Sequence, residues 1–568
     1  MNTGFRLYRL LKRNYKLFNI RITANFSSSY QENDYNQRNS NRQYEGYLKR
    51  FALITSVGLA FGVTLVSLNK DDDKTNDKYG AYIPNLPTYK MSEVAKHKDT
   101  DTRIWTTYRQ GVYDITDYIH QHPGGSDVMK AVAGTSMDPY WKLYAFHEKN
   151  YIFETLERYR IGNLDKEDVP AIDGTDIWAN EPKRHPSLKM PSEKPFCVEP
   201  QPQFLVQNYF TPNELFFVRN HLPVPDIDPS TYKLEVTGIG IDGTQSFTLE
   251  DIKKMPKHTI NCAIQCCGNR RSEMSKIKMV EGLNWDIAAI GNAEWTGVRL
   301  CEFLEQLDIC EFVGAEHVKF EGYDRTPQNV PFGSSMPLLK ALDPRGEVLL
   351  AYEMNGEPLS RDHGFPLRLL IPGTAGARSV KWLAKIILSN EESDSHYYAG
   401  EYKGFSPNVT WENVDFSTAP AVEELPVISA ICVPSDGCEV DLNTETDICV
   451  KGYSYSGGGR RIIRVDLTCD RGNTWHTANL LKEGKKELRA GQNHWDWTLW
   501  EANIPITEDL AAKKEFQIHV KAVDNSYSTQ PECFRNIWNL RGIANVAYHK
   551  ITIKVKPKQR SDVSPECR

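Results

Sequence analysis

Alternation of apolar and polar residues dominates the C-terminal part of the chain. Residues 463–467, 516–522 and 551–555 each place an apolar side chain at every second position. A period of two puts these side chains on one face of a β-strand, and turn-forming residues such as those at 470–473 separate the runs. The pattern predicts an all-β, antiparallel sandwich that begins near residue 427.

A mixed pattern occupies residues 203–420. Short apolar runs over 233–237 and 348–352 are typical of β-strands. Residues 300–307 instead space leucine and phenylalanine three and four positions apart, as on one face of a helix. Strands and helices mixed in this way indicate an α+β domain.

Proline separates this domain from a smaller unit ahead of it. Residues 86–165 form a tyrosine-rich block that contains histidine, and residues 166–202 carry repeated prolines with mixed charges between them. Because proline interrupts helices and central strands, repeated prolines favour an extended tether. The expected order is a small domain at 86–165, a flexible linker at 166–202, the α+β domain at 203–420, the β-sandwich at 421–557 and a tail at 558–568.

The first 80 residues have the composition of a targeting segment. Residues 1–31 contain arginine and lysine but no acidic residue, as in a mitochondrial presequence. The uncharged, mostly apolar run at 51–68 is long enough to span a bilayer. Together they resemble a bipartite sorting signal for the mitochondrial intermembrane space. Cleavage after the apolar run and its retention as a membrane anchor are both open at this point.

Length and composition narrow the class of protein. A chain of 568 residues exceeds what one core supports, so several domains are expected. The net charge of -6 and the lack of a long basic block give no support to nucleic-acid binding. The twelve cysteines show neither the framework of a small secreted protein nor the CxxC pairs of a zinc ribbon.

Candidate chemistry concentrates at residues 261–271, where three cysteines precede Arg270 and Arg271. A thiolate is a ligand for a soft transition metal, and an arginine fork recognises an oxyanion through charge-assisted hydrogen bonds. The stretch therefore predicts a metal centre beside an anion site. Cys262, Cys266 and Cys267 compete for the role of ligand on this reasoning alone.

Two histidines suggest a second metal centre in the small N-terminal unit. His122 begins a His-Pro-Gly-Gly turn, and His147 follows a short aromatic stretch expected to be helical. Either residue alone is as ordinary as any surface or core histidine, but two facing neutral imidazoles can hold haem iron with no open position, which favours electron transfer. The Tyr-Asp-Ile-Thr-Asp-Tyr-Ile run at 113–119, the turn and the second histidine together resemble cytochrome b5. The resemblance implies an α+β haem domain with His122 and His147 as iron ligands.

Residues 265–274 resemble the Gln-Cys-Ala-Gly-Asn-Arg-Arg-Ser-Glu-Met segment of sulfite oxidases. That register implies that Cys266 binds molybdenum in a molybdenum-molybdopterin cofactor (Moco), while Cys267 stands where the family has a small alanine. The role of Cys267 stays open. The resemblance extends to the C-terminal unit, which it identifies as an immunoglobulin-like dimerisation domain.

Further motifs carry the same resemblance, including Phe-Phe-Val-Arg-Asn-His-Leu-Pro at 216–223, Tyr-Lys-Gly-Phe-Ser-Pro at 402–407 and the glycine run ending in Arg460. They imply a set of catalytic residues that surrounds the anion: Cys266, Tyr402, Arg219, Arg271 and Arg460. They also imply a set that contacts the cofactor: Phe216, Phe217, Val218, Arg219, Asn220, His221, Cys266, Asp324, His363, Arg368, Ser379, Val380 and Lys381.

The resemblance implies oxidation of sulfite to sulfate, with electrons passing one at a time through the b5-type haem to cytochrome c. It also implies a homodimer in the intermembrane space, with membrane contact only through an uncleaved sorting segment. Nitrate reductase shares these units, but in another order, and the chain is expected to lack room for a flavin and nicotinamide domain. A third hypothesis is a membrane-anchored b5-type electron carrier whose large C-terminal region is a scaffold.

Overall fold

The computed structural model describes residues 78–122, 129–144, 147, 149–169, 176–311, 313–481 and 491–556. The basic N-terminal residues, the apolar run at 51–68 and the tail at 558–568 lie outside the described residues. Within the described part of the chain, no helix is both long and apolar enough to cross a membrane.

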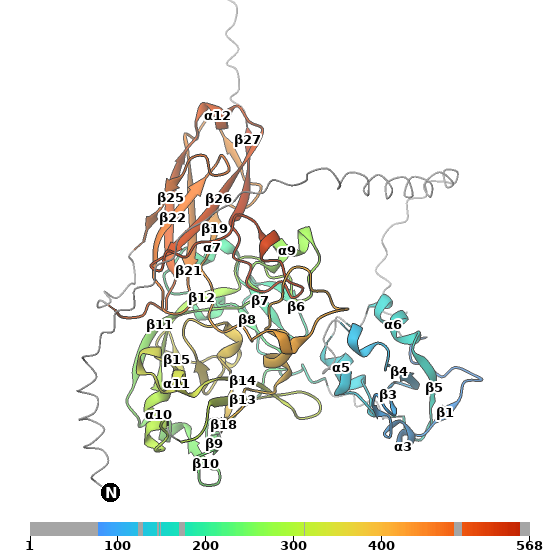
Figure 1. Cartoon of the computed structure of the whole chain (residues 1–568). Coiled ribbons are helices and arrows are strands. Elements are labelled where there is room, and N and C mark those ends of the chain that lie inside the picture. Colours follow the sequence, from blue (N-terminus) through green and yellow to red (C-terminus); the bar gives the residue numbers. More distant parts are fainter. Residues whose placement is uncertain are drawn as a thin grey trace, which may run out of the picture. The chain divides into compact units, whose positions relative to one another are not determined.

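The small N-terminal unit is built on one five-stranded sheet (Figure 1). Its strands, in sheet order, are β1 (Thr88–Tyr89), β5 (Arg160–Leu164), β4 (Gly111–Asp114), β3 (Arg103–Tyr108) and β2 (Lys98–Asp99). Its helices are α3 (Met91–Val94), α5 (Asp138–Leu143) and α6 (Asn150–Glu157). Helix α5 ends before His147, so this histidine lies beyond the helix that was expected to carry it.

The central unit contains two larger sheets. The first has the order β10 (Gln245–Thr248), β9 (Lys233–Gly238), β18 (Leu383–Ser389), β13 (His317–Arg325) and β14 (Pro331–Pro337). The second joins β11 (His258–Gln265), β12 (Ile290–Arg299), β15 (Leu349–Met354) and β16 (Glu357–Pro358), with β17 (Arg368–Leu370) also paired to β15. The helices here include α8 (Leu249–Lys253), α9 (Arg271–Ile277), α10 (Leu300–Gln306) and α11 (Leu338–Leu342). The strands expected at 233–237 and 348–352 and the helix expected at 300–307 correspond to β9, β15 and α10.

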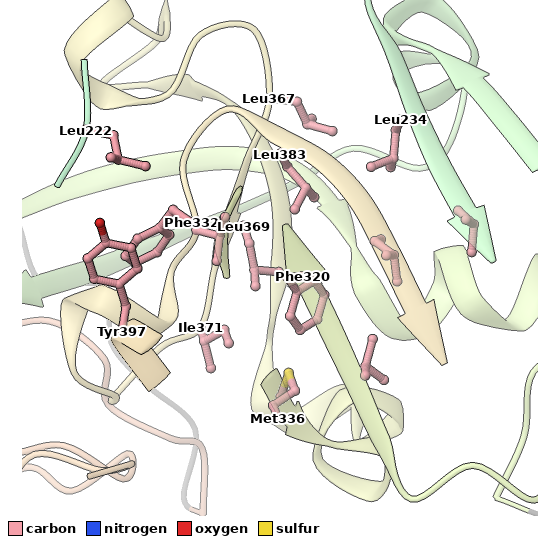
Figure 2. Packing of buried hydrophobic residues seen from close by; sticks show 14 of the residues in the cluster. Leu222, Leu234, Phe320, Phe332, Met336, Leu367, Leu369, Ile371, Leu383 and Tyr397 are labelled. Carbon is pink, nitrogen blue, oxygen red and sulfur yellow. The ribbon is translucent and has the colours of Figure 1, made fainter. Parts of the chain in front are cut away.

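The core of the first sheet follows from the period of two. Strand β13 alternates buried and half-buried residues along its length. Phe320 of β13 packs near Met336 and Leu383, and all three are buried (Figure 2). Complete burial of one such side chain contributes about 1.5–3 kcal/mol. The alternation thus fixes which face of β13 turns inward.

The C-terminal unit consists of two sheets around a shared apolar core. One contains β19 (Ile428–Val433), β21 (Asp447–Tyr455), β25 (Thr498–Pro505) and β24 (Asn479–Leu480). The other contains β20 (Glu439–Asp441), β27 (His549–Lys556), β26 (Glu515–Asp524), β22 (Ile462–Thr468) and β23 (His476–Thr477), and a short helix α12 (Glu508–Ala511) precedes β26. The long strands run side by side in Figure 1. The predicted turn at 470–473 has positive φ angles at Arg471 and Gly472.

The second half of the expected linker is folded, contrary to the prediction of a flexible tether over 166–202. Strands β6 (Lys189–Ser192) and β7 (Cys197–Glu199) form a sheet with β8 (Val218–Arg219), and a short helix α7 (Pro202–Leu205) follows. Arg184 pairs with Asp362 at 2.6 Å. The prolines lie beside the short strands or in the edge strand β6. A missing N–H at these positions costs no hydrogen bond between strands, so the prolines do not prevent sheet formation.

Candidate active site and haem site

The cysteine-rich stretch covers the end of strand β11 and the turn that leads into helix α9. Strand β11 pairs with β12 along its whole length, from His258 opposite Gly297 to Gln265 opposite Ile290. Cys266 follows directly, and its N–H donates to the carbonyl of Ala289 at 2.9 Å. Arg270 takes a left-handed conformation with φ of 66°, after which helix α9 begins at Arg271. Strand pairing therefore fixes where the loop leaves the sheet.

Of the three cysteines in this stretch, all of which are described, Cys266 lines the central cavity and the other two do not. Cys267 packs into an apolar cluster, and burial raises the pKa of its thiol to about 12. Burial likewise raises the pKa of Cys262 far above its ordinary value. Both are held as neutral thiols, which are poor metal ligands. The cavity thus favours Cys266 among the three candidates.

Arg271 is anchored beside Cys266 by backbone carbonyls. Its Nε donates to the carbonyl of Arg541 at 2.9 Å, and its Nη1 donates to that of Leu283 at 2.8 Å. A Cβ added at Gly268 or Gly282 would lie 2.6 Å from the guanidinium. These glycines allow the backbone to close around a buried cation, which is then fixed in direction.

Two further donors lie at the same cavity. Arg541 is 8% exposed, and its Nε has no hydrogen-bond partner among the described residues; its Nη2 makes only a 3.5 Å contact with the carbonyl of Gly400. The indole Nε1 of the fully buried Trp285 also has no partner there. Arg219 completes the lining of this part of the cavity. Buried donors without protein partners indicate a ligand that accepts hydrogen bonds.

The guanidinium groups are costly to bury without an anion. Burial lowers the pKa of Arg271 and of Arg541. Repulsion from Arg219 adds to the effect at Arg271, and repulsion from Arg271 adds to it at Arg541. A cluster of positive charge with few carboxylate partners in a cavity attracts an anion strongly because the local dielectric is low. The planar forks match the oxygens of a small oxyanion.

Tyr402 faces the same cavity from a different segment. Its hydroxyl lies 2.9 Å from Nε2 of His221. Burial raises the pKa of Tyr402 far above its ordinary value, and burial together with Arg219 and Lys381 lowers the pKa of His221. Both groups are therefore neutral at physiological pH, and the phenol keeps its proton for donation.

A deeper part of the cavity has the chemistry of a pterin and phosphate site. Asp324 is buried, and its Oδ1 has no partner among the described residues. A pterin ring offers the N–H donors that such a carboxylate requires. Lys381 is half-buried, and desolvation lowers its pKa while desolvation raises that of Asp324. The two groups supply an acceptor and a cation within one enclosed site.

Other residues expected at the cofactor divide into two groups. Those whose side chains line the cavity are Phe216, Phe217, Arg219, His221, Cys266, Asp324, His363, Arg368, Ser379 and Lys381. Val218, Asn220 and Val380 do not line it. Asn220 instead donates to Asp362 at 3.2 Å and accepts from Lys381, so it acts behind the cavity wall. The residues present fit Moco, with the cations Arg368 and Lys381 suited to its phosphate.

His122 and His147 face each other in the small N-terminal unit. Their ring centroids lie 6.2 Å apart, and the ring planes differ by 20°. This spacing leaves room for one metal ion between nitrogens that each bond at about 2 Å. Burial, with a further contribution from His122, lowers the pKa of His147 to about 4, so the ring is neutral and can bind a metal. The Pro-Gly-Gly that follows His122 lies outside the described residues.

Comparison with known proteins assigns each unit to a family. Residues 90–165 match the cytochrome b5-like heme/steroid binding domain, 221–397 the oxidoreductase molybdopterin binding domain and 419–556 the Mo-co oxidoreductase dimerisation domain. The mitochondrial sulfite oxidase of Drosophila melanogaster is 50% identical over 473 residues, which cover 83% of this chain and 81% of that protein. The chain belongs to the sulfite oxidase family. The human mitochondrial sulfite oxidase is 46% identical, with 83% and 85% covered.

Two other matches concern proteins outside the sulfite oxidases. The nitrate reductase of Hordeum vulgare is 34% identical and covers 68% of this chain, but the match spans only 44% of that enzyme. The crystal structure of the sulfane dehydrogenase SoxCD from Paracoccus pantotrophus matches with a TM-score of 0.53 at 23% identity, covering 68% of this chain and 97% of that one. The second likeness shows a shared fold.

Arg460 lies apart from the other residues of the expected catalytic set. It was expected to reach the anion from the β unit, but it does not line the described cavity. Its Nε pairs with the buried Asp524 at 3.2 Å, and its Nη1 pairs with Glu424 at 3.4 Å. The charge of Arg460 is thus compensated by two carboxylates, and Arg541 lines the cavity at which Arg460 was expected.

Arg541 and Trp285 were missed by sequence reasoning for different reasons. Arg541 follows Asn-Leu and precedes glycine, without the glycine run that drew attention to Arg460. Trp285 lies outside every motif to which sequence reasoning assigned a function. A signal was present at Gly542, where φ is 56° and an added Cβ would lie 2.9 Å from the side chain of Arg271. Only the three-dimensional contact gives that glycine its meaning.

Proposed function

We propose that the protein is a sulfite oxidase that converts sulfite to sulfate at a molybdenum-pterin centre bound by Cys266. The observation that carries the proposal is the convergence of Arg219, Arg271 and Arg541 on the cavity lined by Cys266. A buried cluster of this kind selects a small, multiply charged oxyanion. The family assignment identifies sulfite as the anion to test first.

The reaction balances as sulfite plus water giving sulfate, two protons and two electrons. Moco, when bound, supplies the two-electron redox chemistry and the transferable oxygen. Arg219, Arg271 and Arg541 bind and orient the anion, and the neutral Tyr402 can donate a hydrogen bond to it. Because substrate and product are both oxyanions, the clamp must not bind sulfate so tightly that release becomes slow.

His122 and His147, whose rings face each other 6.2 Å apart, would hold haem b. When bound, this group would supply one-electron transfer. Cytochrome c is the proposed final acceptor. The haem unit would move between the molybdenum site and this acceptor, because tethering within one chain maintains a high effective concentration.

Location and assembly extend the proposal. Relatives named as mitochondrial and the basic N-terminal composition support a mitochondrial location, and we place the protein in the intermembrane space. We also propose that the C-terminal unit is an immunoglobulin-like sandwich, which its two packed sheets support. We further propose a homodimer formed through this unit, as the name of the matched domain implies. The domain bounds remain those given by the sequence, except that the linker ends before residue 181.

A steady-state assay with sulfite and cytochrome c tests the proposed function. The purified protein, first analysed for molybdenum and haem, should reduce cytochrome c only when sulfite is present. A fully loaded protein that fails with sulfite would contradict the proposal, and turnover with nitrate instead would favour the nitrate reductase hypothesis. Haem without molybdenum in protein purified from its native source would favour the electron-carrier hypothesis.

A further inference from the structure

A short segment accepts three backbone hydrogen bonds from the turn at Cys266 and the start of helix α9. We call residues 285–289 the bracket segment. The N–H of Cys266 donates to the carbonyl of Ala289 at 2.9 Å, that of Arg270 to Asp286 at 2.7 Å, and that of Ser272 to Trp285 at 3.0 Å. The position of the Cys266 loop is therefore tied to the position of this segment.

The side chain of Asn269 adds a bond in the opposite direction. Its Oδ1 accepts from the N–H of Ala289 at 3.1 Å. Its Nδ2 donates to the hydroxyl of Tyr453, which in turn donates to the carbonyl of Ile287 at 2.7 Å. The loop and the bracket segment are thus also joined through a buried tyrosine of the β unit.

One buried carboxylate holds the bracket segment from the remaining side. Oε1 of Glu199 accepts from the N–H of Asp286 at 2.8 Å, and Oε2 accepts from the N–H of Ala288 at 3.1 Å. Glu199 is 1% exposed. No described motif for metal or anion binding contains it. Burying a carboxylate is unfavourable unless both oxygens are bonded, and here backbone donors satisfy both.

The strand that carries Glu199 also contacts Arg219, which with Arg271 and Arg541 forms the proposed oxyanion clamp. Strand β7 pairs with β8, and Cys197 lies directly opposite Arg219. The Sγ of Cys197 lies 3.7 Å from Nη1 of Arg219. One short strand therefore contacts Arg219 at one end and the bracket segment at the other.

We propose that Glu199 is a positioning residue that fixes the Cys266 thiolate relative to the oxyanion clamp by gripping the bracket segment. It does not touch substrate or metal. Its action passes through the N–H groups of Asp286 and Ala288 to the carbonyls that hold Cys266 and Arg270. Trp285, which lines the cavity, belongs to the same segment and is positioned with it. The inference rests on the proposed function only for the choice of substrate in the test.

The charges around Glu199 support this reading. The pKa of Glu199 is raised to about 7, chiefly by burial and also by the nearby Asp286 carboxylate, while the two backbone donors and Lys189 oppose the shift. Lys189 itself pairs with Asp286 at 3.1 Å. Protonation would convert one acceptor oxygen to a donor facing an N–H group. The hydrogen bonds from the bracket segment to Glu199 should therefore weaken as the pH falls below about 7.

The test compares Glu199→Gln with Asp436→Asn in the full-length holoenzyme. Glutamine keeps the volume but presents an NH₂ group to one of the two backbone donors, so one hydrogen bond is lost. Asp436 accepts from the N–H of Thr552 at 2.8 Å on the surface of the β unit and provides a matched control that is remote from the cavity. Hydrogen exchange at residues 286–289, metal content, kcat and KM for sulfite, and the spectrum of the molybdenum centre are measured for each.

Glu199→Gln should accelerate amide exchange in the bracket segment about tenfold, as expected for the loss of one hydrogen bond to a charged group. It should also shift the spectrum of the molybdenum centre and lower kcat more than it changes KM, at equal metal content. Its pH profile should lose the change near pH 7 that is expected of the parent protein. Asp436→Asn should change none of these.

Unchanged exchange at 286–289 together with an unchanged spectrum in Glu199→Gln would overturn the proposal. If this variant does not fold, Tyr453→Phe removes the hydroxyl that holds Ile287 and must reproduce the spectral shift. A parent protein without sulfite turnover would contradict the proposed function instead, and the exchange measurement would still decide the role of Glu199.

Discussion

Replacing Arg541 with methionine tests whether this residue is the third member of the oxyanion clamp. Methionine keeps an apolar stem and removes the guanidinium. The protein would lose little, because Nε has no partner among the described residues and Nη2 makes only a 3.5 Å contact. The ring of Trp411, 4.9 Å from the guanidinium carbon, is worth about 0.5–1 kcal/mol. The backbone carbonyl that anchors Arg271 is retained.

The cost should therefore appear in the reaction and not in the fold. A hydrogen bond between charged groups contributes about 1.5–3 kcal/mol. Its loss corresponds to a fall of about 10- to 150-fold in kcat/KM for sulfite, at 1.36 kcal/mol for each factor of ten. The thermal midpoint should change little, since about 1 kcal/mol is small for a chain of this size.

Arg460→Met is the matched control, because it removes the same group from the residue that the sequence favoured. Arg460 is bonded to Asp524 and Glu424, so its loss should lower stability by about 1–2 kcal/mol. Asp524 keeps the hydroxyl of Ser456 and the N–H of Ser528 as donors, which limits the loss. Sulfite-dependent reduction of cytochrome c gives KM and kcat for both variants. An Arg541→Met protein with kcat/KM within twofold of the parent, or an Arg460→Met protein with the larger defect, would refute the assignment.

Three other changes probe the same region. Cys266→Ser should abolish sulfite turnover while Cys267→Ala retains it, as measured by assay and metal analysis; the reverse result would move the metal to Cys267. Tyr402→Phe, which removes the hydroxyl 2.9 Å from His221, should lower kcat/KM about tenfold at unchanged molybdenum content, and a value equal to the parent's would exclude donation to substrate. Because the folded-state pKa of Glu199, about 7, exceeds the ordinary 4.5, the native protein binds more protons than the unfolded one between these values. The free energy of unfolding of the parent protein should therefore fall by up to about 3 kcal/mol as the pH rises from 4.5 to 7, and Glu199→Gln should remove this contribution. Thermal midpoints of the parent and the variant that change in parallel across about pH 4.5–7 would contradict the prediction.

The fold of the C-terminal unit could be predicted well because its signal is local. In β26, Phe516, Ile518 and Val520 turn into the core as the alternation requires. The loop around Cys266 could also be located, since sulfur and guanidinium groups lie within a few residues of one another. What the sequence left open was the choice among three cysteines. That choice depends on which side chain reaches the cavity, and this follows from the pairing of β11 with β12.

Two predictions failed because a local signal had a different physical cause. Resemblance of the glycine run ending in Arg460 to a family motif implied that Arg460 contacts the anion. In the structure, Gly457 and Gly458 approach Gly373 and Leu425 so closely that a Cβ would collide with them or with Glu424. The prolines of the expected linker likewise suggested a free tether, although short edge strands tolerate them. Glycine and proline report backbone geometry, and the partner that requires this geometry is visible only after folding.

The C-terminal unit contributes a guanidinium to the cavity lined by Cys266, although the family model that matches it is named for dimerisation. Arg541 lies within its matched residues 419–556. The carbonyl of Arg541 orients Arg271, the N–H of Ala544 donates to the carbonyl of Cys267 at 2.8 Å, and Nδ2 of Asn545 donates to that of Arg270 at 2.9 Å. The segment 541–545 thus closes one side of the Cys266 loop, as the bracket segment closes another. A β unit that shifted relative to this loop would displace a guanidinium and loosen the thiolate together, so the clamp and the metal ligand should respond as one element to changes in the C-terminal unit.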